Sequence, residues 1–518
     1  MRRRSPGPTV VLCAILLGGC ASLPTDDARV ETHAVVDTDG THLGQAVVPL
    51  VDQHPELTGV HLIARGADAF AARVVLAEVA ERTLDLQYFS WHRDVVGRLL
   101  ADSVLRAADR GVRVRLLLDD VGTAARDADL LLLDAHPGIE VRLFNPLANR
   151  EARTLSFFAD FARANRRMHN KSFTADNQVA ILGGRNIGEE YFEAHAEHDF
   201  RDRGLVAIGP VVRQVSTQFD LYWNSDATFR VRALSRERPS VEEVARARAD
   251  LAAFVEVQRE SVYAAAVRGS AIVAELRSRS LSLSWGQATV VYDDPAKINA
   301  ESTDRATHLA PKLRPALDAV REEAILVSPY FVPGENGVAV LRGMRERGIR
   351  VRVLTNSLAS TDVPAVHSGY QRYRRSLLEA GVDLYEVRAT ARRADAGAEP
   401  REQNAKATLH AKSMIFDRQV VFLGSMNLDP RSLLVNTEIG ALIQIPDVAR
   451  LLAEEFDRAV AAGAYRLVLA PGNGAASRLE WVSQDAGTET RYASEPLATT
   501  WQRCKVWFLS LLPIEPLL

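Results

Sequence analysis

The segment HNKSFTAD at residues 169–176 recurs as HAKSMIFD at residues 410–417. An apolar stretch follows each copy, and then a glycine and an asparagine, which are Gly183 and Asn186 in the first copy and Gly424 and Asn427 in the second. The spacing between the copies is 241 residues at the histidine, lysine, aspartate, glycine and asparagine alike. A constant spacing over these positions indicates a duplicated domain.

Upstream of each copy the sequence shows the same order of elements: a β-rich run, a helical run, a glycine turn and a second apolar run. The ranges are 83–89, 95–108 and 110–118 in the first half, and 324–332, 338–345 and 347–354 in the second. Apolar strands that alternate with helices predict a buried and largely parallel sheet. We therefore expect an α/β protein with two similar halves.

The composition fits a folded protein of two or more domains. The chain has 518 residues, of which 47% are hydrophobic and 25% are charged. Its formal net charge is −3, and removal of residues 1–19 would take three arginines and leave −6. Proteins that bind nucleic acid through phosphates usually have a basic excess, so this balance argues against a general nuclease. Only six of the 63 basic residues are lysines, and two of those six lie in the repeated segment.

The N-terminus has the features of an export signal. Three arginines at residues 2–4 precede a short apolar run over 9–17, and Leu17-Gly18-Gly19-Cys20 follows. This resembles a bacterial lipobox, which predicts lipidation of Cys20; an ordinary secretory signal with a chance cysteine is the alternative. Ala21 after the cysteine resembles signals sorted to the outer membrane. We expect a lipid-anchored, periplasm-facing protein of the bacterial cell envelope, at the outer membrane.

The repeated H-x-K pattern indicates the chemistry. In a strand, residues i and i+2 face the same side, so His169 with Lys171, and His410 with Lys412, would point into one space. A neutral imidazole can act as a nucleophile, a second histidine can donate or accept a proton, and lysines can stabilise negative charge. The alternative is a core histidine capped by the motif aspartate, which fits a single motif better than two matching ones.

Longer stretches extend the pattern beyond the two motifs. They are LDLQYFSWHRD at 84–94, RRMHNKSFTADNQVAILGGRNIGEEYF at 166–192, LHAKSMIFDRQVVFLGSMNLDPRSLLVNTE at 409–438, and the less specific SPYFVPG at 328–334 and SLLPIEPLL at 510–518. With these segments the chain resembles the phospholipase D superfamily, and within it the bacterial cardiolipin synthase C-type branch. The resemblance implies two tandem phospholipase D-like domains, each a mixed β-sheet flanked by helices, with the active site at the domain interface. A monomer would then hold a complete site.

The resemblance also implies roles for single residues. His169 would be the nucleophile that forms a phosphohistidine and His410 the general acid and base, although the near-symmetry of the motifs leaves this order open. The residues expected to bind the phosphate oxygens are Lys171, Lys412, Asn186, Asn427 and Ser425. No metal or other cofactor is expected, because lysine and asparagine supply the charge stabilisation.

In this family a downstream acid orients each histidine. Glu438 fits this role in the second half, and Asp202 fits it in the first half, where Glu197 and Asp199 compete with it. The motif aspartates complete the catalytic motifs in the sequence, but we interpret them as residues that hold the turn after the motif strand; they are Asp176 and Asp417.

The C-terminal run TWQRCKVWFLSLL at 500–512 carries apolar residues almost all round a helix. Two interpretations stay open, an interfacial membrane helix and a helix docked on the protein's own surface.

We expect six parts in all: a signal peptide at 1–19, a tether at 20–60, a first phospholipase D-like domain at 61–235, an interdomain helical segment at 236–285, a second such domain at 286–465 and a C-terminal extension at 466–518. A mobile loop is expected over 390–406.

The function implied by the resemblance is a membrane-anchored phosphatidyltransferase that transfers a phosphatidyl group to phosphatidylglycerol. Phosphatidylethanolamine is a second candidate substrate, the membrane surface is the expected partner, and nucleic acid is not expected. One alternative is a phospholipase D that hydrolyses phospholipids to phosphatidic acid, and another is a phosphodiesterase or endonuclease. Many cardiolipin synthases carry two N-terminal membrane helices, whereas this chain has a lipobox, so the compartment and the donor lipid stay open.

Overall fold

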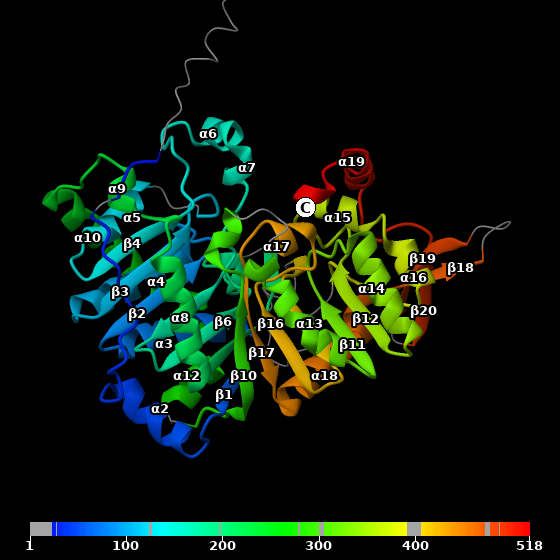
Figure 1. Cartoon of the computed structure of the whole chain (residues 1–518), viewed down its shortest axis with the longest axis horizontal. Helices are drawn as coiled ribbons and strands as arrows, with labels where there is room; N and C mark the ends of the chain where they lie inside the picture. Colours follow the sequence, from blue (N-terminus) through cyan, green and yellow to red (C-terminus); the bar gives the residue numbers. More distant parts are fainter. Residues whose placement is uncertain are drawn as a thin grey trace, which may run out of the picture.

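The computed structural model describes residues 23–26, 28–123, 127–195, 198–277, 280–299, 305–390, 406–471, 477–485 and 487–518. The predicted signal peptide, Cys20, Glu197 and almost all of the loop predicted over 390–406 lie outside these ranges. The first half lies on the left of Figure 1 and the second on the right, and helices cover a sheet that runs through both.

The first half alternates strands and helices in the order that the sequence predicts. Its elements are α2 (His42–Asp52), β1 (Thr58–Ile63), α3 (Gly66–Val79), β2 (Thr83–Tyr88), α4 (Val95–Asp109), β3 (Arg113–Asp119), α5 (Asp127–Asp134), β4 (Ile139–Phe144), α6 (Arg153–Ala159), α7 (Phe161–Ala164), β5 (Ser172–Ala175), β6 (Val179–Gly183), β7 (His198–Arg201), β8 (Gly204–Ile208), α8 (Pro210–Trp223), β9 (Thr228–Arg230) and α9 (Val231–Leu234). Three helices then connect the halves: α10 (Val241–Gln258), α11 (Val262–Arg268) and α12 (Ala271–Arg277).

The second half repeats this order. Its elements are β10 (Ser284–Tyr292), α13 (Ala310–Ala319), β11 (Glu323–Val327), α14 (Gly334–Glu346), β12 (Arg350–Asn356), α15 (Pro364–Tyr370), α16 (Arg374–Glu379), β13 (Asp383–Val387), β14 (Lys406–Leu409), β15 (Ser413–Phe416), β16 (Val420–Gly424), α17 (Pro430–Leu434), β17 (Ile439–Gln444), α18 (Pro446–Gly463), β18 (Ala464–Ala470), β19 (Arg478–Asp485), β20 (Thr488–Tyr492) and α19 (Thr500–Ser510).

The strand pairings show the duplication directly. In each half three parallel strands stand side by side, β2–β3–β4 in the first and β11–β12–β13 in the second. The motif strand pairs antiparallel with the first of the three, β5 with β2 and β15 with β11. Because β1 pairs with β10 at the centre, the sheets of the two halves join into one mixed sheet of 18 strands among the described residues.

Local chemistry places the turns between these elements. Asp94 caps the start of α4 by accepting the N–H of Gly97, which satisfies one of the free donors of the first helical turn. Gly111 follows α4 with φ +95° and Gly348 follows α14 with φ +86°. Residues with a side chain are strained at such angles, so glycine turns the chain from each helix into the next strand.

The halves share a hydrophobic core. One cluster joins Leu182 and Val215 of the first half with Val290, Ile443 and Val448 of the second. All five side chains are buried. A shared core fixes how the two halves face each other, and this arrangement determines the geometry of any site between them.

The described part of the predicted tether differs from the expectation. The segment runs along the first half, because buried arginines of the sheet use its carbonyl groups as acceptors. Arg142 donates to Val30 O at 2.8 Å, and Arg115 donates to Thr32 O at 2.8 Å. The helix α2 and the start of β1 follow within the same range. The tether prediction is therefore wrong for this stretch, whose arginine partners were not visible in the sequence.

The C-terminal extension adds β19 and β20 to the edge of the sheet and ends in α19. This helix packs beside α15, and its buried side chain Val506 clusters with Leu358 and Ala498. Among the described residues, none of the helices combines the length and the apolar character that crossing a bilayer requires.

Candidate functional site

The two motifs meet at the interface of the halves. His169 and Lys171 lie between α7 and β5, and the second histidine lies between β14 and β15. The backbone N–H of His169 donates to Thr437 O at 2.8 Å, and that of His410 donates to Arg201 O at 2.8 Å. In both cases the acceptor belongs to the other half, so backbone hydrogen bonds across the interface hold both motifs in place.

The acids that orient the histidines are exchanged between the halves. His169 Nδ1 lies 2.8 Å from Glu438 Oε2, and His410 Nδ1 lies 2.5 Å from Asp202 Oδ2. Both carboxylates are fully buried. Because each acid engages Nδ1, Nε2 is the ring nitrogen left for reaction. Each histidine thus depends on the half of the chain that does not contain it, an arrangement that the sequence pattern did not indicate.

The short parallel pair β7–β14 explains why Asp202 takes this position. The two strands come from different halves and run in the same direction, so they end side by side. Asp202 directly follows β7, and His410 directly follows β14. Asp199, the described competitor, lies inside β7, where its carboxylate is 3.9 Å from Arg201 Nε.

The two acids differ in charge. Burial raises the pKa of Glu438 to about 7, against the opposing effects of Lys171 and of hydrogen bonds from two serines. Burial also acts on Asp202, but His410, Lys412 and a nearby arginine outweigh it and lower its pKa to about 2. At neutral pH, Asp202 is therefore a full anion, whereas Glu438 holds a proton for part of the time.

The basic groups are held in states suited to nucleophilic chemistry. Burial and Lys171 are the main causes that lower the pKa of His169 well below its usual value, and burial and Lys412 lower that of His410 to about 4. Burial also lowers the pKa of Lys412 to about 8 and that of Lys171 well below its ordinary range. Both imidazoles are therefore neutral in this state, and a bound phosphodiester, which is negatively charged, would raise all four pKa values.

The lysine side chains stay close to their own motifs. Lys171 Nζ donates to His169 O at 2.6 Å. Lys412 Nζ donates to His410 O and lies 3.0 Å from His410 Nδ1. Both ammonium groups are buried beside the histidines, where a phosphate oxygen would meet two positive charges.

Aromatic side chains surround the histidines. Phe89 meets the ring of His169 edge-on at 5.2 Å between centroids. Tyr191 meets His410 edge-on at 5.1 Å, and Phe200 stacks on His410 at 5.2 Å. Such walls reduce the access of water to the site. The sequence analysis did not identify these three residues, although Phe89 and Tyr191 lie in the quoted segments.

The residues expected to bind phosphate make different contacts. Asn186 accepts from the N–H of Ser90 at 3.3 Å and donates to Tyr191 Oη at 3.0 Å. Asn427 keeps a buried Oδ1 without a hydrogen-bond partner among the described residues. Ser425 donates its hydroxyl proton to Glu438 and accepts from the N–H of Ile439 at 3.0 Å. In the structure the hydroxyl proton of Ser425 is therefore directed to Glu438, and its contact with a substrate phosphate stays a prediction.

The motif aspartates lie at the far end of the motif strands from the histidines. Asp176 follows β5 and accepts the N–H groups of Glu81, Arg82 and Thr83. Asp417 follows β15 and accepts the equivalent three, those of residues 321–323. Their contacts join the start of the neighbouring strand to the turn, which is a structural position.

A buried ion pair supports Glu438 from behind. Asp293 Oδ2 accepts the N–H of Glu438 at 2.8 Å, and Lys297 Nζ lies 3.0 Å from Asp293 Oδ1. Ser432 donates to Glu438 Oε1 at 2.8 Å. The sequence analysis missed these residues; the one available signal was that Lys297 is among only six lysines in the chain.

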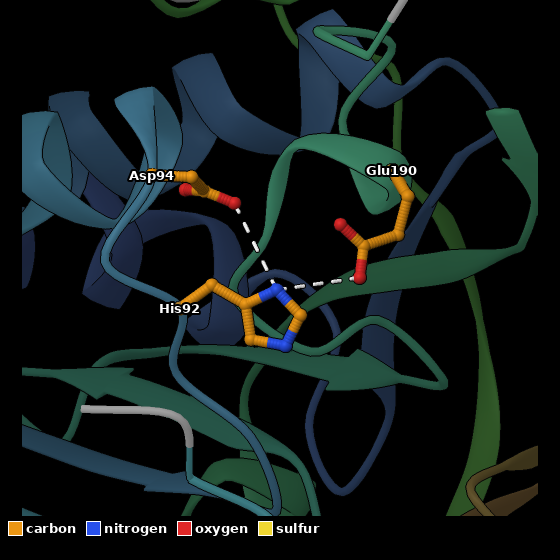
Figure 2. A group of neighbouring side chains, drawn as sticks. All are labelled: His92, Asp94 and Glu190. Carbon is orange, nitrogen blue, oxygen red and sulfur yellow. Dashed lines mark ion pairs between the residues drawn. The ribbon is translucent and has the colours of Figure 1, made fainter. Parts of the chain in front are cut away.

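One group of described side chains could in principle bind a metal ion, and Figure 2 shows it. His92 Nδ1 lies 3.4 Å from Glu190 Oε1 and 3.8 Å from Asp94 Oδ2. Both oxygens of Asp94 already accept backbone N–H groups, from Gly97 and Glu189. The group joins the loop after β2 to the loop after the first motif, and these contacts account for its arrangement without a metal.

Comparison with known proteins adds to this geometry. The family described as "Cardiolipin synthase, PLD-like domain" matches twice, over residues 76–223 and 313–460. Cardiolipin synthase C of Escherichia coli K12 is 42% identical over 481 residues, which cover 92% of this chain and 99% of that protein. A cardiolipin synthase of Oceanobacillus iheyensis is 24% identical over 400 residues, covering 77% of this chain and 68% of its own length. The solved phosphatidylserine synthase of Haemophilus influenzae has the same fold, with a TM-score of 0.55 and 13% identity over 81% of this chain and 91% of that one.

Proposed function

The chain belongs to the phospholipase D-like family of cardiolipin synthases and is an enzyme of the phosphatidyltransferase or phospholipase D type, and from this premise we propose that it transfers a phosphatidyl group to phosphatidylglycerol through a phosphohistidine. The observation that carries the proposal is the meeting of two acid-paired histidines and two buried lysines at one interface. This set can attack a phosphodiester, protonate its leaving group and balance its charge.

In the first step His169 Nε2 attacks the phosphorus of the donor lipid. A nitrogen–phosphorus bond forms, and the bond from phosphorus to the headgroup oxygen breaks. His410, once protonated, gives its Nε2 proton to the departing alkoxide, which leaves as an alcohol. Lys171 and Lys412 stabilise the negative charge on the non-bridging oxygens during the transfer.

In the second step the headgroup hydroxyl of phosphatidylglycerol attacks the phosphohistidine. His410 accepts the hydroxyl proton, an oxygen–phosphorus bond forms and the nitrogen–phosphorus bond breaks. Cardiolipin leaves, and both histidines return to their starting states. Water in place of this hydroxyl would give phosphatidic acid, and the aromatic residues Phe89, Tyr191 and Phe200 around the histidines support the transferase over this hydrolysis.

The difference between the two acids supports the assignment of the histidines. An anionic Asp202 stabilises the positive charge that His410 must carry as a general acid. A Glu438 that is partly protonated at neutral pH favours a neutral imidazole at His169, which is the nucleophilic form. The opposite assignment would pair the general acid with Glu438, which is only partly ionised at neutral pH.

Anchoring completes the proposal. Lipidation of Cys20 would attach the chain to the periplasmic side of the envelope and bring the site to its lipid substrates. The support for this step is the lipobox-like sequence at 17–20.

Lipid mass spectrometry tests the function. The purified chain from residue 21 onward is incubated with phosphatidylglycerol vesicles, with and without phosphatidylethanolamine. His169→Ala is the inactive variant, and His42→Ala, which changes an exposed histidine of α2, is the matched control. We expect cardiolipin from the wild type and the control only. Phosphatidic acid without cardiolipin would replace the transferase by a hydrolase, and neither product would contradict both.

A trapping experiment tests the roles of the histidines. A phosphodiester with a 4-nitrophenolate leaving group needs no general acid, so His410→Ala should release about one equivalent of nitrophenol and keep the phosphoryl group on His169. Phosphopeptide mapping identifies the labelled residue. A label on His410 in the reciprocal variant His169→Ala would reverse the assignment.

A further inference from the structure

The C-terminal helix α19 exposes an unusual set of side chains. Trp501, Trp507, Phe508 and Leu511 are exposed by 58% to 76%, whereas Val506 is buried against the protein. Docking therefore uses only one side of the helix, and the aromatic side faces solvent. Large aromatic side chains that gather on one exposed surface indicate an interaction site.

The helix is firmly held in this orientation. Thr499 and Gln502 form a reciprocal capping box at its start. Arg503 donates to Glu495 O at 2.8 Å, and Arg372 donates to Ser510 O at its end. These contacts fix the helix from both ends, so the exposure of its aromatic side is a property of the fold.

The first half carries a second exposed apolar helix. In α6, Leu155 and Phe158 are exposed by 63% and 68%. Arg153 holds the base of this helix by donating to Asp120 O at 2.6 Å. Two helices that lie far apart in the sequence thus present large apolar side chains to solvent.

Both helices protrude from the same edge of the molecule, the upper edge in Figure 1. The topology explains this. The segment with α6 and α7 follows the carboxyl end of β4, and α15, on which α19 packs, follows the carboxyl end of β12. The histidines lie at the same ends of the strands, since Phe89 after β2 contacts His169 and Asn356 at the end of β12 accepts the N–H of Leu409 next to His410.

The chemistry of this surface fits a lipid bilayer. Tryptophan and phenylalanine with neighbouring arginine or lysine suit the headgroup region, where apolar rings and phosphates are both present. α19 carries Arg503 and Lys505 and no acidic residue.

We propose that α19 and α6 form one membrane-seating surface that rests on an anionic phospholipid bilayer and turns the edge with the two histidines toward it. The surface consists of Leu155 and Phe158 from α6, and Trp501, Trp507, Phe508 and Leu511 from α19. The proposal deepens the proposed function, on which it rests for the identity of the lipid. Its test needs no turnover, so the two can fail separately.

Vesicle binding of the non-acylated chain, residues 21–518, measures the surface directly. The probes are phosphatidylglycerol vesicles and phosphatidylcholine vesicles. We expect Trp507→Ser with Phe508→Ser, and separately Leu155→Ser with Phe158→Ser, each to weaken partitioning onto phosphatidylglycerol about tenfold or more. The matched control is Val241→Ser with Val257→Ser, which changes two side chains of α10 exposed by 82% and 74%. It should bind within twofold of the wild type.

A fluorophore on Cys504 gives an independent readout. This exposed residue of α19 is the only cysteine from residue 21 onward. Its emission should shift to the blue on phosphatidylglycerol vesicles and be quenched by brominated acyl chains. Far-ultraviolet circular dichroism and turnover of a short-chain, monomeric lipid should stay at the wild-type level in both pair variants, which separates loss of seating from loss of fold.

Three outcomes would overturn the proposal. Wild-type partitioning of either pair variant would exclude the helix concerned from the surface. An equal loss of vesicle partitioning in the α10 control would mean that exposed apolar residues promote binding wherever they lie on the surface. A lipid-free dimer that dissociates in Trp507→Ser with Phe508→Ser would assign α19 to contact between copies of the chain. Binding through this surface without any turnover would refute the proposed function alone.

Discussion

Replacing Asp202 by asparagine separates the two histidines experimentally. The substitution keeps the size of the side chain and removes the charge that faces His410 Nδ1 at 2.5 Å. It leaves the pairing of His169 with Glu438 in place. If His410 is the general acid and base, the variant should fail only in steps that move a proton through His410.

The structure sets the magnitude. Burial raises the pKa of Asp202, but the opposing contacts, of which the hydrogen bond from His410 is the largest, lower it to about 2. A hydrogen bond to a charged group contributes about 2 kcal/mol. Because coupling is reciprocal, loss of this contact in the asparagine variant should lower the proton affinity of His410 by about 30-fold. Loss of ring orientation brings the expected fall in kcat to about 100-fold or more.

The assay compares two leaving groups. A lipid alkoxide needs a proton from His410, whereas 4-nitrophenolate leaves without one. We expect Asp202→Asn to lower cardiolipin formation about 100-fold or more and to change the first-turnover burst of nitrophenol less than about fivefold. Glu438→Gln is the control, since it acts on the nucleophile and should lower both rates.

Two results would refute this reasoning. An equal loss in both reactions would mean that Asp202 serves the nucleophile or the fold as a whole. An unchanged rate of cardiolipin formation would mean that the charge of Asp202 plays no part in catalysis. Thermal unfolding of each variant at pH 7 shows whether the protein assayed is folded.

Three further predictions concern the surroundings of the site. Folding raises the pKa of Glu438 to about 7, so as the pH rises the unfolded chain loses this proton before the folded chain does. The wild type should therefore lose about 3 kcal/mol of stability between about pH 4.5 and 7. Urea unfolding of Glu438→Gln should lack this loss, and parallel stability–pH curves for the two proteins would contradict the prediction. Ser425→Ala removes a hydrogen-bond donor to Glu438, so the pKa of Glu438 should rise further and the pH–rate profile should shift to higher pH. We expect kcat to fall about tenfold at unchanged KM. A change confined to KM would instead indicate that Ser425 contacts the substrate. Asp176→Ala leaves three backbone N–H groups without their acceptor and should cost about 3 kcal/mol in denaturant unfolding with kcat per folded molecule within about threefold; inactivity at full stability would give Asp176 a catalytic role.

Much of the fold could be predicted because it is local and occurs twice. The alternation of apolar strands with helices follows from side-chain periodicity, and the repeat at residues 169 and 410 identified the two motifs. Both family matches and the paired strand orders confirm the two-domain α/β prediction.

The exchange of acids could not be predicted in the same way. Which carboxylate reaches which histidine depends on how the halves pack, and in particular on the pairing of β7 with β14. The sequence left Asp202 beside Asp199 and Glu197, and only the position of His410 distinguishes Asp202 from Asp199. Periodicity contains no information about contacts between segments so far apart.

The same limit applies to the direction of single side chains. Ser425 lies at the site, as expected, but its hydroxyl is directed to Glu438 because that buried carboxyl needs donors. The N-terminal segment has no periodicity of its own and is placed by arginines of distant strands that need acceptors.

The exchanged acids also bear on how the two halves of the gene can change. Substitution of Asp202 damages a histidine encoded 208 codons later, and substitution of Glu438 damages one encoded 269 codons earlier. Each half therefore completes an acid–histidine pair of the other, as in a symmetric dimer whose subunits complete each other's sites. A fragment that ends after the first half would contain His169 without Glu438 and Asp202 without His410.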